Sequence, residues 1–156
     1  MAIRRILTEG DPALRKKSRP VGKVDARIRT LIDDLAQTMY AADGAGLAAP
    51  QVGILRRVVV VDVGDGLLEL VDPEITDSKG EEVRAEGCLS IPGKRGTVAR
   101  PSVITVRAMN RQGRYKTYEA DDMLAVALCH EIDHLDGILY TDKMIEDVTD
   151  QYTEES

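Results

Sequence analysis

The sequence predicts an α+β fold in which antiparallel sheets pack around one central helix. Two observations predict it. Short β-branched runs with glycine-rich turns fill the middle of the chain, and one strongly apolar helical segment follows them. Strands grouped ahead of a single helix differ from the regular strand–helix alternation of a parallel sheet. A chain of 156 residues suits one domain with its own core, so we expect a single domain over 1–156.

The first predicted helix covers residues 25–42. Its apolar residues recur at helical spacing, and they are Ile28, Leu31, Ile32, Leu35 and Met39. Asp25 is a suitable N-cap, and Gly44 lies just past the end of the pattern. We therefore expect an amphipathic helix that packs on one side only.

Two sets of strands are expected after this helix. Residues 57–63 contain four consecutive valines and read as a buried strand, which should pair with residues 67–71 across the Gly64–Asp65–Gly66 turn. A second antiparallel set is indicated by Val98, Val103, Ile104 and Val106, followed by residues 115–118. The stretch 110–113 would form its turn.

The last predicted helix covers residues 121–136 and is ended by Gly137. Its first half, residues 123–128, is apolar on every side and should be buried. Polar residues begin only at Cys129. Placing two histidines and two acids on a buried helix costs free energy unless they are bound or paired, which indicates a functional site.

The two histidines of the chain lie in this helix, within His130-Glu131-Ile132-Asp133-His134. Residues four apart share one face of a helix, so both imidazoles can bind one metal ion. Glu131 can then reach a water held by that metal, as in helical hydrolytic zinc sites. The alternative is an ordinary pair of structural or surface histidines. Burial favours a metal-binding helix.

A catalytic site of this kind needs three protein ligands and one open position. No histidine remains, and the best third candidate is Cys88, which lies between glycines in residues 86–93. Cys129 is less suitable because adjacent helical residues point about 100° apart. A small core residue is the other role open to Cys88. The glycine-rich segment 44–53 also lets a backbone approach a ligand closely, and Gln51 adds an amide donor, although such turns are often only structural.

Composition narrows the classes of partner. The formal net charge is −6, which disfavours nonspecific binding to nucleic acid, and Phe and Trp stacking platforms are absent. Basic runs near the N-terminus read as a solvated face. No apolar run is long enough to span a membrane or to serve as a signal peptide, and two cysteines are too few for a disulfide framework. We therefore expect a cytoplasmic protein without a membrane or specific nucleic-acid partner.

Three segments in order resemble the motifs of the peptide deformylases. The family's first motif, a glycine, a hydrophobic residue and then Gly-Leu-Ala-Ala-Pro-Gln, is similar to residues 44–51. The second, Glu-Gly-Cys-Leu-Ser, matches residues 86–90, and the third, which holds the two histidines and the glutamate, matches residues 130–134. The resemblance covers nearly the whole chain, and it implies a single catalytic domain of this family.

The resemblance implies a metal-dependent hydrolase for N-terminal methionine processing in protein biosynthesis. It would remove the formyl group from the N-terminal formyl-methionine of newly made polypeptides and release formate. Cys88, His130 and His134 would be the metal ligands. Glu131 would be the general base and later the general acid.

Further residues are implied by position in the motifs. The side-chain amide of Gln51 and the backbone N–H of Leu89 would form the oxyanion hole. Gly44 and Gly46 would lie at the substrate, with Gly46 giving backbone hydrogen bonds to a peptide that adds as a strand. Arg95 would be a substrate-side arginine.

Metal and partners are also implied by the resemblance. It implies one Fe(II) per chain, which Zn(II), Ni(II) or Co(II) can replace, whereas a Cys-His-His set by itself points to zinc. The expected partners are N-formyl-methionyl nascent peptides and, transiently, the ribosome. Some bacterial members dock through a basic C-terminal helix, but this chain has no Lys or Arg after Lys143, so docking through its tail is not expected.

Two other functions fit parts of the pattern. A zinc endopeptidase uses the same helix motif with a distant glutamate as third ligand. A structural metal module would close the fourth position with protein, and Cys129 would be the spare thiolate. The chain also departs from the family pattern at one position. Many deformylases have glutamine where this chain has Cys129, so we expect altered side-chain packing near the pocket there.

Overall fold

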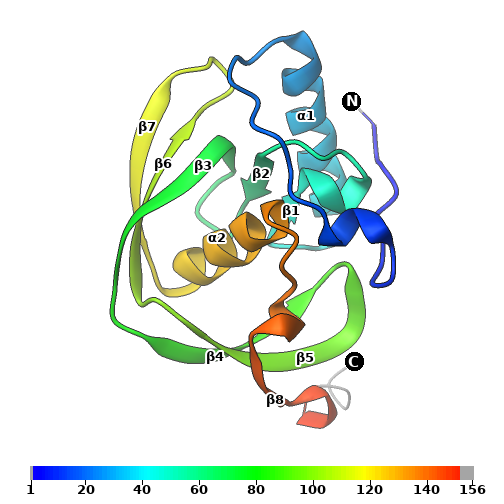
Figure 1. The fold of residues 1–156 in the computed structure, drawn as a ribbon, viewed down its shortest axis with the longest axis vertical. Coiled ribbons are helices and arrows are strands. Elements are labelled where there is room, and N and C mark those ends of the chain that lie inside the picture. Colours follow the sequence, from blue (N-terminus) through cyan, green and yellow to red (C-terminus); the bar gives the residue numbers. More distant parts are fainter. Residues whose placement is uncertain (1, 152–156) are drawn as a thin grey trace.

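The computed structural model describes residues 2–151. A central helix, α2 (Asp122–Leu135), lies between a five-stranded sheet and a three-stranded sheet, and a second helix, α1 (Ala26–Ala41), covers the other side of the larger sheet (Figure 1). Both sheets are antiparallel throughout. The predicted α+β fold, with antiparallel sheets around one helix, is confirmed.

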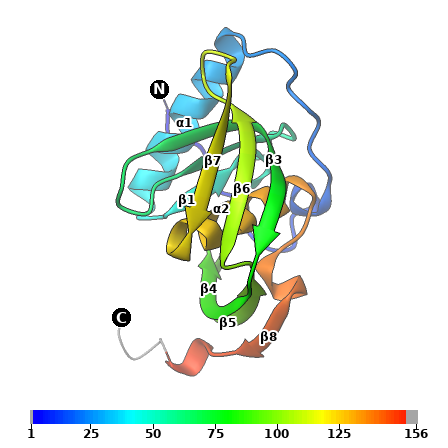
Figure 2. The same cartoon turned by 90° about the vertical axis from the view of Figure 1, so that its left-hand side faces the viewer.

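The five-stranded sheet has the order β1-β2-β3-β6-β7. Its strands are β1 (Gly46–Ala48), β2 (Val58–Val61), β3 (Leu68–Lys79), β6 (Val103–Met109) and β7 (Tyr115–Asp121). Figure 2 shows β3, β6 and β7 side by side in front of α2. The predicted hairpins β2–β3 and β6–β7 are both present, the second with its turn between Asn110 and Gly113.

Two details of the predicted strands are wrong. The two predicted sets form one sheet, because β3 continues past Val71 to Lys79 and pairs with β6. This second half of β3 is polar and largely exposed, so it lacks the apolar alternation that marks a strand. Val98 is also not part of that sheet. It lies in β5 of the smaller one.

The three-stranded sheet has the order β4-β5-β8 and lies on the opposite side of α2 from the larger sheet (Figure 1). Its strands are β4 (Glu82–Cys88), β5 (Ile91–Arg100) and β8 (Met144–Asp147). After Lys143 the described chain forms β8 and a single 3-10 turn (Thr149–Gln151), so no α-helix follows α2 up to residue 151. Glu154 and Glu155 of the acidic tail lie outside the described residues.

Both helices begin and end close to the predicted residues. The Asp25 carboxylate accepts a hydrogen bond from the Ile28 N–H at 3.0 Å and caps α1, as predicted. The apolar stripe of α1 packs on β1 and β2 around Leu47, Val58 and Val60. Helix α2 ends at Leu135, and Gly137 follows in the left-handed region with φ +74°.

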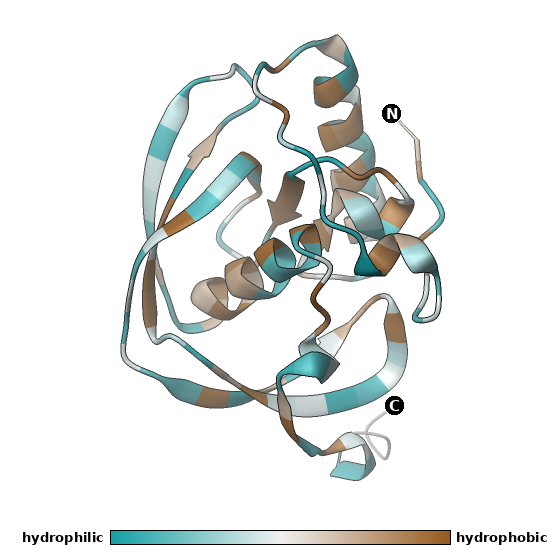
Figure 3. Cartoon of the chain, viewed as in Figure 1, coloured by the Kyte–Doolittle hydropathy of each residue, from teal (hydrophilic) through white to brown (hydrophobic). Residues whose placement is uncertain are grey.

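Helix α2 is less buried in its first half than the sequence predicts. Met123 is 51% exposed and lines a cleft, together with Val126 and Ala127. An apolar residue that lines a ligand cleft cannot be distinguished from a core residue by its sequence pattern, which explains the error. Figure 3 shows α2 hydrophobic over its first turns, with hydrophilic residues appearing toward its end.

Among the described residues, no helix is both long enough and apolar enough to cross a membrane.

Candidate metal centre and active-site cleft

A cleft of about 570 Å³ opens between the free edges of the two sheets, with α2 as its floor. Strand β1 and the loop before it line one side, and β4 with the following turn lines the other. Both β1 and β4 are edge strands of their sheets. Each therefore offers unpaired backbone groups toward a segment of chain that enters between them.

Three potential metal ligands meet at the floor of this cleft. Cys88 Sγ and one nitrogen each of His130 and His134 all lie within 4.8 Å of one another. Cys88 ends β4, while both histidines come from one face of α2. Cys88 Sγ is 3.3 Å from His134 Nε2. The three residues proposed from the sequence as ligands are thus brought together.

The two imidazoles differ in their surroundings. His130 Nδ1 lies 2.9 Å from a Glu86 carboxylate oxygen, which leaves Nε2 for a metal, and the Tyr140 ring stacks on it with centroids 6.0 Å apart. Burial disfavours the charged form of His130, but the negative charges of Glu131, Cys88 and Glu86 outweigh burial and raise its pKa to about 10. Burial lowers the pKa of His134, which stays neutral. One thiol and two imidazoles in a negative environment fit a divalent cation.

Glu131 lies beside the candidate metal ligands. Its side chain is buried, with Oε2 4.0 Å from His130 Nε2. Its Oε1 has no hydrogen-bond partner among the described residues, although it is buried. Burial raises the pKa of Glu131 to about 7, against the opposing charge of His130. A carboxylate oxygen that no protein group occupies is available to take a proton in the cleft.

Gly46 has to be glycine because it lies against this carboxylate. A Cβ built on Gly46 would come within 2.6 Å of Glu131 Oε2. Gly44 is similarly close to the β4–β5 turn, with 2.6 Å between a built Cβ and Leu89 Cδ1. Both predicted glycines line the cleft. Their close approach keeps β1 open beside the candidate base.

Gln51 and Leu89 lie beside Cys88. The Gln51 carbonyl accepts the Ala48 N–H at 2.9 Å, which turns Gln51 Nε2 toward the cleft. That nitrogen donates to Ser90 Oγ at 3.1 Å and lies 3.7 Å from Cys88 Sγ. Leu89 occupies the turn directly after Cys88. Two potential donors therefore flank the candidate metal centre.

Arg95 lies on β5 at the rim of the cleft. Its guanidinium packs over Gly87, where a built Cβ would be 3.1 Å from the guanidinium carbon. The Arg95 backbone is held by Thr149, whose Oγ1 accepts the Arg95 N–H at 3.1 Å. Eight of the nine site residues predicted from the sequence thus line one cleft, and the ninth, His134, is buried beside it in contact with Cys88.

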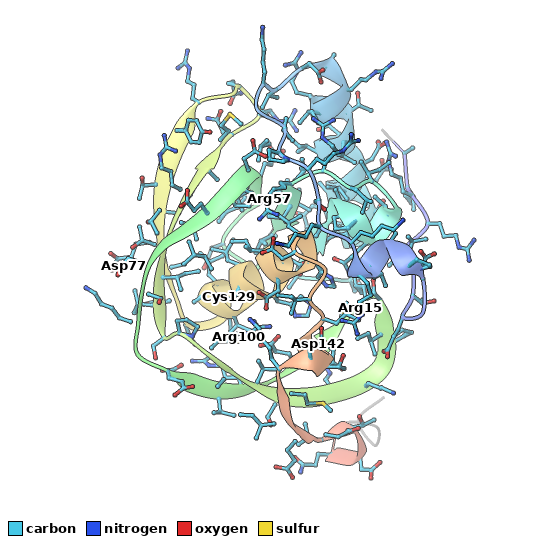
Figure 4. All side chains as sticks on the ribbon, in the orientation of Figure 1. Arg15, Arg57, Asp77, Arg100, Cys129 and Asp142 are labelled. Carbon is cyan, nitrogen blue, oxygen red and sulfur yellow. The ribbon has the colours of Figure 1, made fainter. Side chains whose placement is uncertain are left out.

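Cys129 is not part of the group. It is 5% exposed and packs in the core between α2 and the larger sheet, and Figure 4 shows it on α2. Burial raises the pKa of its thiol. Its predicted orientation, on a different face from the ligands, is confirmed. The residue therefore offers no fourth ligand for a closed structural site.

The site also includes buried residues that sequence reasoning did not select. Ser90 is fully buried and accepts the Gln51 amide, and Glu86 is 5% exposed and pairs with Arg100. Burial opposes the charge on Glu86, but Arg100 and His130 hold the pKa of its carboxyl below the usual range. Glu86 and Ser90 lie two residues before and after Cys88, so their closeness to Cys88 in the sequence could have indicated that they belong to the site. Nothing in the sequence indicated Arg100.

A helix with two histidines and an acid, in contact with a cysteine beside a cleft of an α+β domain, is typical of a metallohydrolase. The family described as Polypeptide deformylase matches residues 3–149. Curated relatives named peptide deformylase include one from Acetivibrio thermocellus, 62% identical over 145 residues, which are 93% of this chain and 85% of that protein. Another, from Alkaliphilus metalliredigens, is 58% identical over 94% of this chain and 100% of its own length.

Solved structures agree with the sequence relatives. The crystal structure of peptide deformylase from Thermotoga maritima superimposes with a TM-score of 0.90 at 41% identity, covering 92% of this chain and 99% of that one. A peptide deformylase from Synechococcus elongatus in complex with actinonin gives a TM-score of 0.89 at 38% identity, covering 97% of this chain and 84% of that one. The chain therefore belongs to the peptide deformylase family, hydrolases that remove the N-formyl group of nascent peptides in a metal-dependent reaction.

Proposed function

We propose that this chain deformylates the N-terminal formyl-methionine of nascent polypeptides at a metal held by Cys88, His130 and His134. The observation that carries the proposal is the convergence of these three side chains, within 4.8 Å, at the floor of a cleft between two free strand edges. A divalent cation held there would supply a polarising charge and would lower the pKa of a bound water toward about 7.

Glu131 is the proposed general base. Its unpartnered Oε1 takes a proton from the attacking water as a new C–O bond forms at the formyl carbon. The same carboxyl then gives the proton to the amine nitrogen as the C–N bond breaks. Formate and a free N-terminus result.

Gln51 and Leu89 are the proposed oxyanion donors. Charge develops on the formyl oxygen during the attack, and donors already aimed at it need no rearrangement. The Gln51 amide is held in place by the Ala48 N–H, and the Leu89 N–H follows Cys88 directly. A donor of this kind is worth about 3 kcal/mol in comparable enzymes.

The substrate is proposed to enter as an added strand between β1 and β4. Gly44 and Gly46 keep the β1 edge open for backbone hydrogen bonds, and Arg95 stands at the rim where the peptide continues. Met123, Val126 and Ala127 give the cleft an apolar wall that suits a methionine side chain.

We propose Fe(II) as the metal, one per chain, with Zn(II), Ni(II) or Co(II) as substitutes. The support for iron is family resemblance, since a thiolate and two imidazoles also suit zinc. The chain is proposed to act as one catalytic domain over 1–156 in the cytoplasm, which fits the family match over residues 3–149. Transient contact with the ribosome would bring it to its substrates.

The protease alternative needs a distant acid as third ligand. Among the described residues, the three-membered group of potential ligands contains Cys88 in that place. Glu86, the nearest buried carboxylate in this segment, is taken up by Arg100 and by the other nitrogen of His130. These contacts favour deformylation over peptide-bond cleavage.

Formate release from a formyl-Met tripeptide tests the proposal. Protein purified without oxygen should release formate from this peptide and lose the activity on treatment with a chelator. The unformylated Met tripeptide, incubated in parallel, should stay uncut. Cleavage of its peptide bonds, or formate release that survives removal of the metal, would contradict the proposed function.

A further inference from the structure

A buried charge network lies directly behind the candidate metal centre. It is centred on Arg100 at the end of β5, whose side chain is 4% exposed, and on Glu86 of β4, whose side chain is 3% exposed. Figure 4 shows Arg100 in the space between α2 and the strands β4 and β5. The network continues through Asp133 of α2 to Lys143.

We propose that Arg100 is a positioning residue of the metal centre. It holds the Glu86 carboxylate that orients His130, and through Asp133 it fixes the helical turn that carries both histidines. The inference rests on the proposed function only in taking Cys88, His130 and His134 as the ligands.

Arg100 grips Glu86 with two hydrogen bonds. Its Nε donates to one carboxylate oxygen at 2.8 Å and its Nη2 to the other at 2.9 Å. Such a fork fixes both the position and the plane of a carboxylate. Lysine has a single ammonium group at this place and cannot reproduce the fork.

The Glu86 carboxylate, fixed in this way, in turn orients the His130 ring. The oxygen that accepts Arg100 Nη2 is also the one 2.9 Å from His130 Nδ1. A carboxylate at this nitrogen sets the tautomer and the rotation of a metal-binding imidazole, and leaves Nε2 to the metal. Any shift of the Arg100 fork therefore moves the acceptor that holds the ring.

Asp133 connects Arg100 to the helix itself. Arg100 Nη1 donates to Asp133 at 2.6 Å, and Lys143 Nζ lies 3.1 Å from the same carboxylate. Asp133 directly precedes His134 on α2. His134 Nδ1 is buried and has no hydrogen-bond partner among the described residues, so the position of this ring depends on its helix and its packing.

Stability alone is a weak reason for this network. Desolvation of buried ion pairs commonly offsets their attraction, and apolar replacements of similar volume are often neutral or stabilising. Here the buried charges meet at the one helix that carries two candidate ligands. Their location points to control of the ligand geometry.

Release of Co(II) from the Arg100→Lys variant tests the proposal. The Co(II)-loaded protein is mixed with excess EDTA, and loss of the visible Co(II) bands is followed in time. Arg100→Lys should release Co(II) about 10- to 100-fold faster than wild type, the range typical for loss of a partner of a metal-binding histidine. The visible spectrum of the bound Co(II) should also change.

Arg111→Lys is the matched control. Arg111 also forms a fork on one carboxylate, Glu69, and reaches a second, Asp33, but it does not line the cleft and links α1 to β3. Its variant should keep the wild-type rate of Co(II) release. A loss of stability alone would affect the melting temperature of both variants, whereas only loss of positioning changes Co(II) release selectively.

Wild-type Co(II) release from folded Arg100→Lys protein would overturn the proposal. If Arg100→Lys does not fold, Asp133→Asn decides instead, because its side chain keeps the shape and leaves the fork on Glu86 intact. Release that is several-fold faster supports the proposal, and an unchanged rate rejects it. Co(II) release involves no formyl substrate, so failure of this inference is distinct from failure of the deformylase assay.

Discussion

Replacing Glu131 with glutamine is expected to lower the rate of deformylation by about 10²- to 10⁴-fold, the usual contribution of a positioned acid–base group. The amide keeps the shape of the side chain in its buried place beside Gly46, but it cannot accept the proton. The proposed ligands Cys88, His130 and His134 are untouched, so metal content should stay at the wild-type level. Formate release and metal content, measured on the same preparation, check both expectations.

Asp136→Asn serves as the control for this change. Asp136 also carries a carboxylate, at the end of the same helix, but it pairs with Arg57 outside the cleft. Its variant should deformylate at nearly the wild-type rate. A Glu131→Gln enzyme that stayed within a few-fold of wild type would show that another group carries the proton.

Replacing Cys88 with alanine is expected to remove both metal and activity. Cys88 supplies the one sulfur among the three converging ligand atoms, at the end of β4. Two histidines of one helix would remain, and two ligands are fewer than a catalytic site needs. The loss of metal affinity should exceed the 10- to 100-fold typical of a changed outer partner. Metal titration and formate release measure the effect.

The second cysteine of the chain gives the matched control. Cys129 is buried in the core, on a different face of α2 from the candidate ligands. Cys129→Ala removes a small side chain and should leave metal affinity unchanged. Retention of metal by Cys88→Ala protein would favour an acidic third ligand and the protease alternative.

The sequence predicted the helices and the candidate metal ligands because both leave local patterns. The 3.6-residue spacing of apolar residues marked α1, and Asp25 and Gly137 marked helix boundaries. The spacing of His130 and His134 placed both on one face without any knowledge of the fold. Helical geometry alone was enough to predict that these two residues lie together.

Long-range pairing was less accessible. The second half of β3 is strand because β6 lies beside it, although its residues are polar. Arg100 of β5 pairs with Glu86 of β4 and with Asp133 of α2. No residue spacing along the chain predicts these contacts. Met123 appeared to be a core residue because a cleft wall and a core select the same side chains.

X-ray absorption at the metal edge of protein purified without oxygen tests the central claim most directly. We expect one metal per chain, with one sulfur ligand from Cys88 and nitrogen ligands from His130 and His134. The sulfur contribution should be present in Cys129→Ala protein. A coordination shell of nitrogen and oxygen alone, in active wild-type protein, would contradict the proposed metal centre.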